Sequence, residues 1–103
     1  MGASKSDSFS EDHNQVAILF KALSHPARIA IIEYLLSVDT CICGDIVNEL
    51  PLAQPTVSQH LSALKNAGII KGNIEGTAIC YCLNTETFEK IESYFFAITK
   101  KLK

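Results

Sequence analysis

The hydrophobic positions in the first part of the chain recur at helical spacing. Over Ser10–Leu23, a serine that suits a helix cap precedes two acidic residues, and apolar residues then follow three and four positions apart. A second helix is predicted to start at the capping segment Ser24–Pro26 and to run to about Ser37. Its predicted inward residues are Ile29, Ile32, Leu35 and Leu36. The segment Thr40–Cys43 is too short for a helix and rich in strand-favouring residues, so it predicts a brief strand.

Two further helical patterns follow close together. Apolar residues recur at helical spacing over Gly44–Leu50, and Pro51 ends this short helix. A fourth helix is predicted to begin at about Pro55 and to end at Gly68, because glycine suits the C-terminal cap. Its predicted inward residues are Val57, Leu61 and Leu64. A helix, a turn and a second helix in this order form a helix-turn-helix outline.

The last part of the chain predicts a β-hairpin and a long helix. Residues 69–74 and 77–83 favour strands and flank Glu75 and Gly76, a two-residue turn with glycine where a positive φ is needed. Asn84 or Thr85 caps the last helix, whose apolar residues alternate spacings of three and four, as in helix–helix contacts. They are Phe88, Ile91, Phe95, Ile98 and Leu102. The element order, α-α-β-α-α-β-β-α, is mainly α with a small β-wing. It predicts a winged helix-turn-helix domain over residues 10–103, behind a flexible tail of residues 1–9.

Size and composition fit one such domain. The chain has 103 residues, of which 48% are hydrophobic and 19% charged, so it has enough apolar material to fold. A monomer this small buries its surface poorly, so the apolar surplus predicts a homodimer. The net charge of −2 excludes a generally basic surface, so any DNA contact must be local. No stretch approaches the roughly 18 apolar residues of a membrane span, and the N-terminus is polar, so we expect a cytoplasmic protein without membrane contact.

Three segments resemble the ArsR/SmtB family of bacterial repressors. They are residues 20–28 (Phe-Lys-Ala-Leu-Ser-His-Pro-Ala-Arg), residues 54–61 (Gln-Pro-Thr-Val-Ser-Gln-His-Leu) and residues 64–70 (Leu-Lys-Asn-Ala-Gly-Ile-Ile). The resemblance covers roughly residues 14–100. It implies a homodimeric repressor that leaves double-stranded operator DNA when an effector binds. No enzyme is expected, because the sequence shows no nucleophile–base pair and no Gly-rich phosphate loop.

The predicted fourth helix carries the candidate DNA contacts. Short polar residues near its N-terminus are predicted to face outward, where they can exchange hydrogen bonds with base edges. The resemblance implies DNA contact for Gln54, Ser58 and Gln59 in particular. His60 fits either a phosphate contact or packing under the wing. Two lysines are the only basic residues between Gln54 and Leu83, and they complete the candidate set. The set is Gln54, Thr56, Ser58, Gln59, His60, Lys65 and Lys71.

Two features of this region depart from the family's pattern. Ala53 stands where a Ser or Thr cap is expected, so the helix lacks its usual side-chain acceptor unless Gln54 substitutes. The predicted wing tip, residues 73–77, lacks the arginines of similar proteins. We therefore expect few phosphate contacts and a shallow dependence of DNA affinity on salt.

Four cysteines form two Cys-x-Cys pairs, Cys41/Cys43 and Cys80/Cys82. In winged helices the strand before the helix-turn-helix usually pairs with the second wing strand, which would put the pairs on neighbouring strands. Residues i and i+2 of a strand share a face, so all four sulfurs converge if register and face agree. They would then hold a thiophilic ion such as As(III), Zn or Cd, or oxidise to cross-strand disulfides or persulfides. The alternative is that they are small buried hydrophobic residues.

The resemblance supports a metal site only in part. Arsenic- and cadmium-responsive members carry a Cys-x-Cys directly before Asp-Leu, whereas here Gly44 separates Cys43 from Asp45. A one-residue shift exchanges the two faces of a strand and would put the cysteines where buried aliphatic residues normally lie. The family's other metal site uses His and Asp on the terminal helix, and residues 85–103 contain neither. Nickel, cobalt or zinc sensing there is therefore not expected.

Two functional hypotheses follow. In the first, the chain is a homodimeric repressor whose first and last helices form the dimer contact. The candidate interface residues are Leu19, Phe88, Ile91, Phe95 and Ile98. In the second, it is a winged-helix protein-interaction module with weak or no DNA binding and structural cysteines, which the acidic balance and the wing without arginines would favour.

Overall fold

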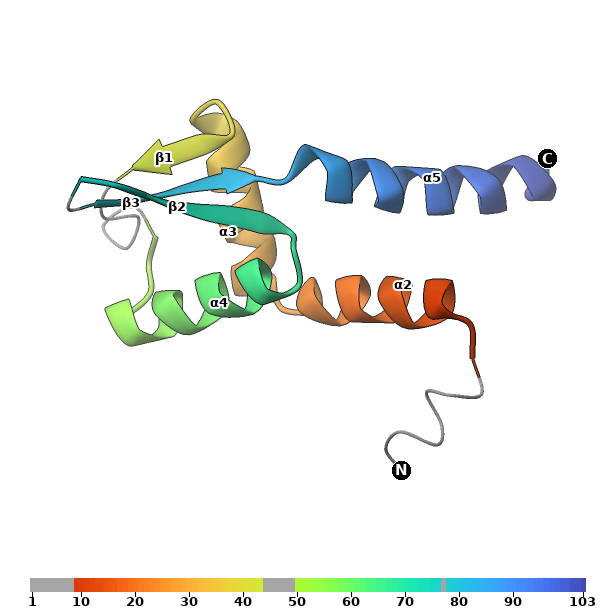
Figure 1. The fold of residues 1–103 in the computed structure, drawn as a ribbon, viewed down its shortest axis with the longest axis horizontal. Helices are drawn as coiled ribbons and strands as arrows, with labels where there is room; N and C mark the ends of the chain where they lie inside the picture. Colours follow the sequence, from red (N-terminus) through yellow and green to blue (C-terminus); the bar gives the residue numbers. More distant parts are fainter. Residues whose placement is uncertain (1–8, 44–49, 77) are drawn as a thin grey trace.

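The computed structural model describes residues 9–43, 50–76 and 78–103. Within these ranges the chain forms four helices and a three-stranded antiparallel sheet, in the order expected for a winged helix-turn-helix (Figure 1). The elements are α2 (Glu11–Ala22), α3 (Pro26–Ser37), β1 (Cys41–Cys43), α4 (Gln54–Asn66), β2 (Ile70–Glu75), β3 (Ala78–Leu83) and α5 (Thr85–Leu102). The helix predicted over Gly44–Leu50 and the tail predicted over residues 1–9 lie outside the described residues, except for Leu50 and Phe9.

The first two helices begin at side-chain caps. The Ser10 hydroxyl accepts a hydrogen bond from the His13 backbone N–H at 3.0 Å, as the sequence predicts. At the start of α3 the capping side chain is His25, whose Nδ1 accepts from the Ala27 N–H at 3.0 Å. Ser24 instead donates its hydroxyl to a carbonyl at the end of α2. Short-range hydrogen bonds therefore fix both helix ends at the bend between α2 and α3.

The sheet has the strand order β1-β3-β2, so β3 is central and pairs antiparallel with both neighbours. This confirms the predicted pairing of the short strand with the second strand of the wing. In the hairpin, Ile74 pairs with Ile79 and Glu75 with Ala78. The predicted turn at Glu75 and Gly76 is therefore wrong by one residue, and the loop begins at Gly76. Gly76 has a φ of +64°, a conformation that glycine adopts without steric cost.

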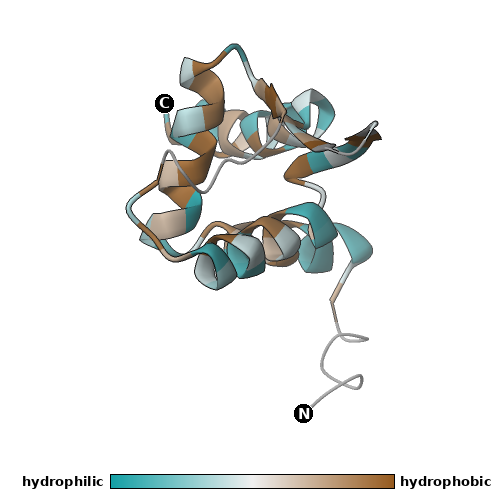
Figure 2. Cartoon of the chain, turned by 90° about the vertical axis from the view of Figure 1, so that its left-hand side faces the viewer, coloured by the Kyte–Doolittle hydropathy of each residue, from teal (hydrophilic) through white to brown (hydrophobic). Residues whose placement is uncertain are grey.

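The hydrophobic core lies where α3, α4 and one face of the sheet meet. Strands β1 and β3 are hydrophobic along most of their length (Figure 2). The largest fully buried side chains are Ile31, Leu35, Val57, Leu64, Ile69 and Ile70. The prediction that Ile29 and Leu36 face inward is wrong, since they are 41% and 58% exposed, whereas Ile31 is fully buried. Because α3 is apolar on nearly all sides, its periodicity does not select one inward face.

Helices α2 and α5 extend together from one end of this body (Figure 1). The Phe20 ring of α2 contacts Tyr94 and Phe95 of α5, with ring centroids 5.7 and 5.5 Å apart. Beyond these contacts, the second half of α5 leaves large apolar side chains exposed. They are Phe95, Phe96, Ile98 and Leu102. The chain thus has an apolar helix surface that its own core does not cover.

No single helix in the described ranges is long and apolar enough to cross a membrane; α2 and α3 meet those criteria only as a pair, bent by 87°.

Candidate functional site

Helix α4 divides its residues between the core and the surface. The buried residues are Val57, His60, Leu61 and Leu64. Gln54, Ser58 and Gln59 are exposed, as predicted, and Thr56 is half-buried. Ser62 is also exposed, one turn beyond Ser58, and belongs to the same outward row, although the sequence reasoning did not include it. The exposed surface of α4 is therefore a row of short, uncharged hydrogen-bonding side chains.

The N-terminus of α4 has no side-chain cap, which confirms the prediction made from Ala53. Ala53 occupies the N-cap position with extended backbone, and among the described residues no side chain caps this end of the helix. Gln54 does not substitute for the missing cap. The first turn therefore keeps backbone donors and the positive end of the helix dipole available next to Gln54 and Ser58.

The two candidate lysines lie where α4 meets the wing. The side chain of Lys65 passes over Gly72 of β2: a Cβ built at Gly72 would lie 3.4 Å from Lys65 Cδ and 3.5 Å from Cε. Lys71, the residue before, is exposed and pairs with Cys82 of β3. The stem of Lys65 thus lies between α4 and the wing, whereas Lys71 shares the outer face of the sheet with Cys82.

His60 is not part of the exposed row, and this corrects the sequence reasoning. Its side chain is only 9% exposed, and its Nδ1 accepts a hydrogen bond from Arg28 Nε at 3.2 Å. The His25 ring lies against it, with centroids 4.4 Å apart. Arg28 also donates to the Ala22 carbonyl at 3.1 Å. His60 therefore packs against the start of α3, not under the wing, and links α4 to α3 there.

The surroundings of His60 favour its neutral form. Burial, followed by the positive charge of neighbouring His25 and Arg28, lowers the pKa of His60 from its usual value of 6.5. The neutral ring has one nitrogen that accepts, which is the state that the hydrogen bond from Arg28 requires. Sequence reasoning missed this cluster, although its residues lie in two of the family-like segments.

The four cysteines come together as two cross-strand pairs. In the β1–β3 ladder Cys41 faces Cys82 and Cys43 faces Cys80, with Cα atoms 4.1 and 3.9 Å apart. Both pairs are joined as disulfides. Such short separations are typical of antiparallel pairs that exchange no backbone hydrogen bonds, where side chains are closest. This is one of the arrangements that the spacing of the cysteines left open.

The cysteines lie on the face of the sheet opposite the core. Ile42, Tyr81 and Leu83 alternate with them along the strands and pack against the core. Cys41 and Cys43 are exposed, Cys82 is half-buried and Cys80 is 5% exposed. The expectation that Cys41 and Cys43 replace buried aliphatic residues is therefore wrong, because Ile42 takes the core position in β1, whereas Cys80 is buried as the alternative reading predicted. Simple burial does not account for Cys41 and Cys43.

The metal interpretation finds no assembled ligand set in the described ranges. No group of three or more His, Cys, Asp or Glu residues there is arranged to hold a metal ion. The sulfur atoms of the four cysteines are instead bonded to one another, and a disulfide sulfur lacks the thiolate that binds As(III), Zn or Cd.

The candidate dimer residues divide into two groups. Leu19, Phe88 and Ile91 are partly buried against the protomer's own core, whereas Phe95 and Ile98 are 51% and 40% exposed. Exposed Phe96 and Tyr94 extend the apolar surface. The heptad pattern did not include these two residues, although three consecutive aromatic residues at positions 94–96 are visible in the sequence.

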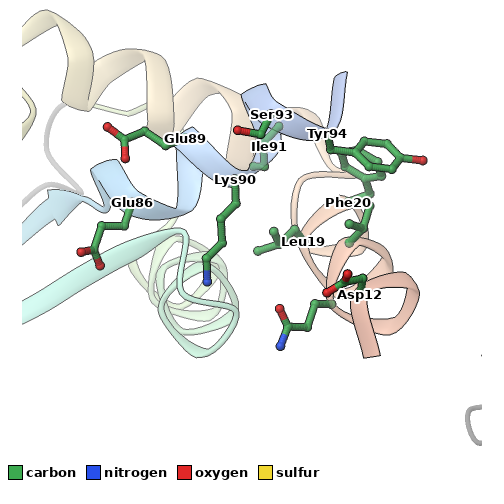
Figure 3. Close-up of a pocket in the computed structure, with 11 residues that line it drawn as sticks. Asp12, Leu19, Phe20, Glu86, Glu89, Lys90, Ile91, Ser93 and Tyr94 are labelled. Carbon is green, nitrogen blue, oxygen red and sulfur yellow. The ribbon is translucent and has the colours of Figure 1, made fainter. Parts of the chain in front are cut away.

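A groove of about 790 Å³ runs between α2 and α5 (Figure 3). Leu19 and Phe20 line it from α2, and Ile91 and Tyr94 from α5. Figure 3 shows Lys90 extending from α5 toward α2 across this groove. The two projecting helices thus enclose an open apolar channel with charged residues along its rim.

Comparison with known proteins identifies the family. Residues 25–71 match the family described as bacterial regulatory protein, arsR family. An uncharacterized HTH-type transcriptional regulator of Methanocaldococcus jannaschii is 38% identical over 82 residues, which are 79% of this chain and 91% of that protein. This chain belongs to the ArsR family. A second relative is the cadmium resistance transcriptional regulatory protein CadC homolog of Staphylococcus aureus, 37% identical over 84% of this chain and 72% of that protein.

Solved structures agree with this assignment. HlyU from Vibrio cholerae superposes with a TM-score of 0.68 at 28% identity, over 84% of this chain and 94% of that one. An ArsR family transcriptional regulator, RHA00566, gives a TM-score of 0.73 at 21% identity, over 91% and 95% of the two chains, and shows the shared fold. The protein is thus a DNA-binding transcriptional regulator with a winged helix, and not an enzyme.

The segment that matches the ArsR family contains some of the candidate residues and excludes others. It includes α3, α4 and the first residues of β2, and so all seven candidate DNA contacts as well as Arg28. It ends before Cys80 and Cys82. Helix α4 therefore lies within the matched segment, whereas half of the cysteine cluster lies beyond it.

Proposed function

We propose that this ArsR-family regulator is a homodimeric repressor that reads operator DNA with α4 and the β2–β3 wing. The observation that carries the proposal is the division of α4 into a buried apolar face and an exposed polar row. In a helix-turn-helix, such a row lies in the major groove, and a wing lies beside it. Gln54 and Gln59 offer the paired donor and acceptor that match adenine, and Ser58 reaches a neighbouring base edge.

Lys65 and Lys71 supply the local positive charge that an acidic chain otherwise lacks. With only these two lysines between Gln54 and Leu83, one of them on the outer face of the sheet, we expect few phosphates to be neutralised, and hence a shallow salt dependence. A slope of log affinity against log salt as steep as about −8 would contradict this, because it requires about nine neutralised phosphates.

The apolar second half of α5 supports a homodimer. Phe95, Phe96 and Ile98 are exposed beside the groove between α2 and α5, and a second copy of the same surface can cover them. Dimerisation would also set two copies of α4 at the fixed spacing that two operator half-sites require. Sedimentation of the wild-type chain should give about twice 11.3 kDa. Phe95→Glu should shift it toward the monomer, while Lys101→Ala, on the exposed last turn of α5, should leave it unchanged.

The DNA-binding part is tested by fluorescence anisotropy with DNA from upstream of the protein's own gene. Wild type should prefer this fragment over a shuffled fragment of equal length. Gln59→Ala should lose about tenfold in affinity for it, because a paired base contact contributes about 1–3 kcal/mol of discrimination. Asn66→Ala, an exposed amide in the last turn of the same helix, is the matched control and should bind like wild type. Equal binding to both fragments at low salt would contradict operator recognition.

The proposal includes an effector that acts at the four cysteines and releases the repressor. The supporting observation is that β1 and β3 carry all four of them on one face, beside Lys71 of the candidate DNA interface.

A further inference from the structure

The outer face of the sheet gathers reactive side chains that the DNA-binding role does not use. Four sulfur atoms lie on two adjacent strands, on the side away from the core. β1 is the edge strand, so one half of each pair belongs to the sheet's border and the other half to the central strand. Packing does not explain Cys41 and Cys43, because they are exposed and Ile42 between them takes the core position.

Solvent access differs between the two members of each pair. Cys41 and Cys43 on β1 are exposed, whereas their partners on β3 are half-buried or buried, with Cys80 only 5% exposed. A small thiol or disulfide in solution can therefore reach the β1 sulfurs directly. Each β3 cysteine faces its β1 partner, with Cα atoms about 4 Å apart, so its sulfur can react with the sulfur of that partner.

Two neighbours favour the thiolate form that thiol–disulfide exchange requires. The Thr40 hydroxyl lies 3.9 Å from Cys41 Sγ and can donate a hydrogen bond to a thiolate there. Lys71 is the cross-strand neighbour of Cys82, so its ammonium group extends from the same face of the sheet. A nearby cation stabilises a thiolate and makes the cysteine more reactive.

We infer that the β1–β3 ladder is a thiol–disulfide exchange site for low-molecular-weight disulfides, and that its oxidation weakens operator binding. The Cys41 thiolate attacks one sulfur of the small disulfide, forms a mixed disulfide and releases one thiol. The Cys82 thiolate then attacks Cys41 Sγ, closes the cross-strand bond and releases the second thiol. Cys43 and Cys80 react in the same way. Each pair loses two electrons and two protons, and the small disulfide is reduced to two thiols.

The link to DNA binding follows from the segment that the two disulfides enclose. The disulfides join residues separated by 41 and 37 positions, and the enclosed segment contains all of α4 and β2. Closing them ties β1, from which residues 44–53 lead to α4, to the wing strand β3. The covalent bonds add to the backbone pairing of β1 with β3, so the strand that leads to α4 and the wing strand cannot separate when the protein fits itself to the operator. A compartment that keeps thiols reduced makes the reduced form the resting, DNA-bound one.

The test rests on the proposed function and separates the two claims. The full chain is purified with dithiothreitol under nitrogen and divided; one half is treated with oxidised glutathione, and the thiols of both are counted. Affinity for the fragment upstream of its own gene is then measured by anisotropy. The reduced protein should have four thiols and bind, and the oxidised protein should have none and bind about tenfold more weakly, within the usual range of allosteric coupling. Dithiothreitol should restore both values.

Serine variants supply the control. The protein with all four cysteines replaced by serine should bind like the reduced wild type and ignore glutathione disulfide. Loss of all four thiols without a change in affinity would overturn the link to DNA binding, and a response that survives in the serine variant would overturn the site. Release of the reduced protein by arsenite or Zn(II), with no response to glutathione disulfide, would assign the cysteines to metal instead. If reduced protein does not prefer its own fragment, the proposed function fails, and the thiol count alone then decides whether the exchange site exists.

Discussion

Two clusters hold the recognition helix, and they use different kinds of bond. At the α3 end, Arg28 and His60 form a partly buried hydrogen bond, and the His60 ring lies against His25. At the sheet, the Cys41–Cys82 and Cys43–Cys80 bonds close the loop that contains α4. The first contact forms whenever the chain folds at neutral pH, whereas the second depends on the redox state of its surroundings. The contact between α4 and α3 therefore forms on folding, whereas the bonds between β1 and β3 form or break as the cysteines are oxidised or reduced.

The largest expected effect comes from the disulfides. Reduction should lower the free energy of unfolding by about 4 kcal/mol, because a bridge across roughly 40 residues removes that much chain entropy from the unfolded state. Nearly all of this should come from one bridge, since the second closes only a very short additional loop. Urea unfolding at fixed protein concentration measures it. The double variant Cys43→Ser/Cys80→Ser should keep most of the stabilisation, and loss of half or more would contradict the nested arrangement.

The next prediction concerns the hydrogen bond between Arg28 and His60. Arg28→Ala should lower the free energy of unfolding by about 2 kcal/mol, because it leaves His60 Nδ1 and the Ala22 carbonyl without their donor in a partly buried place. Lys21→Ala, an exposed substitution at the end of α2, is the control and should change it by less than about 0.5 kcal/mol. The loss should be the same with oxidised and reduced protein. A loss that appears in only one redox state would show that the two clusters are not independent.

The smallest effect is a pH dependence that arises from His60. Its pKa is lowered in the folded protein, so the unfolded chain takes up a proton first as pH falls below about 6.5. Stability should therefore fall with decreasing pH from that point, until the folded pKa is reached, by at most about 1.4 kcal/mol per pH unit. His60→Gln keeps an acceptor for Arg28 and does not titrate. Thermal unfolding between pH 7.5 and 5 should show a flatter profile for this variant, and an unchanged profile would assign the slope to other groups.

Much of the architecture could be predicted because local signals agree with it. The serine cap of α2, the glycine after α4 and the turn glycine of the hairpin each act within a few residues, and the strand order followed from the fold. The inward face of α3 could not be predicted, because a helix that is apolar on almost every side carries no directional pattern. The hairpin loop was shifted by one residue, since glycine fits either central position of a tight turn.

The sites were predicted less completely than the fold. The exposed row of α4 followed from its periodicity, but a polar residue inside the buried face, His60, could not be distinguished from the surface residues beside it. Its partners Arg28 and His25 lie about 32 and 35 positions earlier, a separation that periodicity does not bridge. For the cysteines, spacing predicted a shared face, whereas the pairing depends on the register between β1 and β3, which only the folded chain sets.

The most direct test of this account compares matched with mismatched cysteine pairs. Cys43→Ser/Cys80→Ser leaves the facing residues Cys41 and Cys82, whereas Cys43→Ser/Cys82→Ser leaves Cys41 and Cys80, which lie on a diagonal of the ladder. Diagonal residues are about 7–8 Å apart, too far for a disulfide without backbone movement. Both variants are oxidised with glutathione disulfide, and their masses are measured without reduction. The account predicts that the matched variant forms an internal disulfide, two mass units lighter than the dithiol, and that the mismatched variant retains thiols or bound glutathione. Equal closure of the two variants would contradict it.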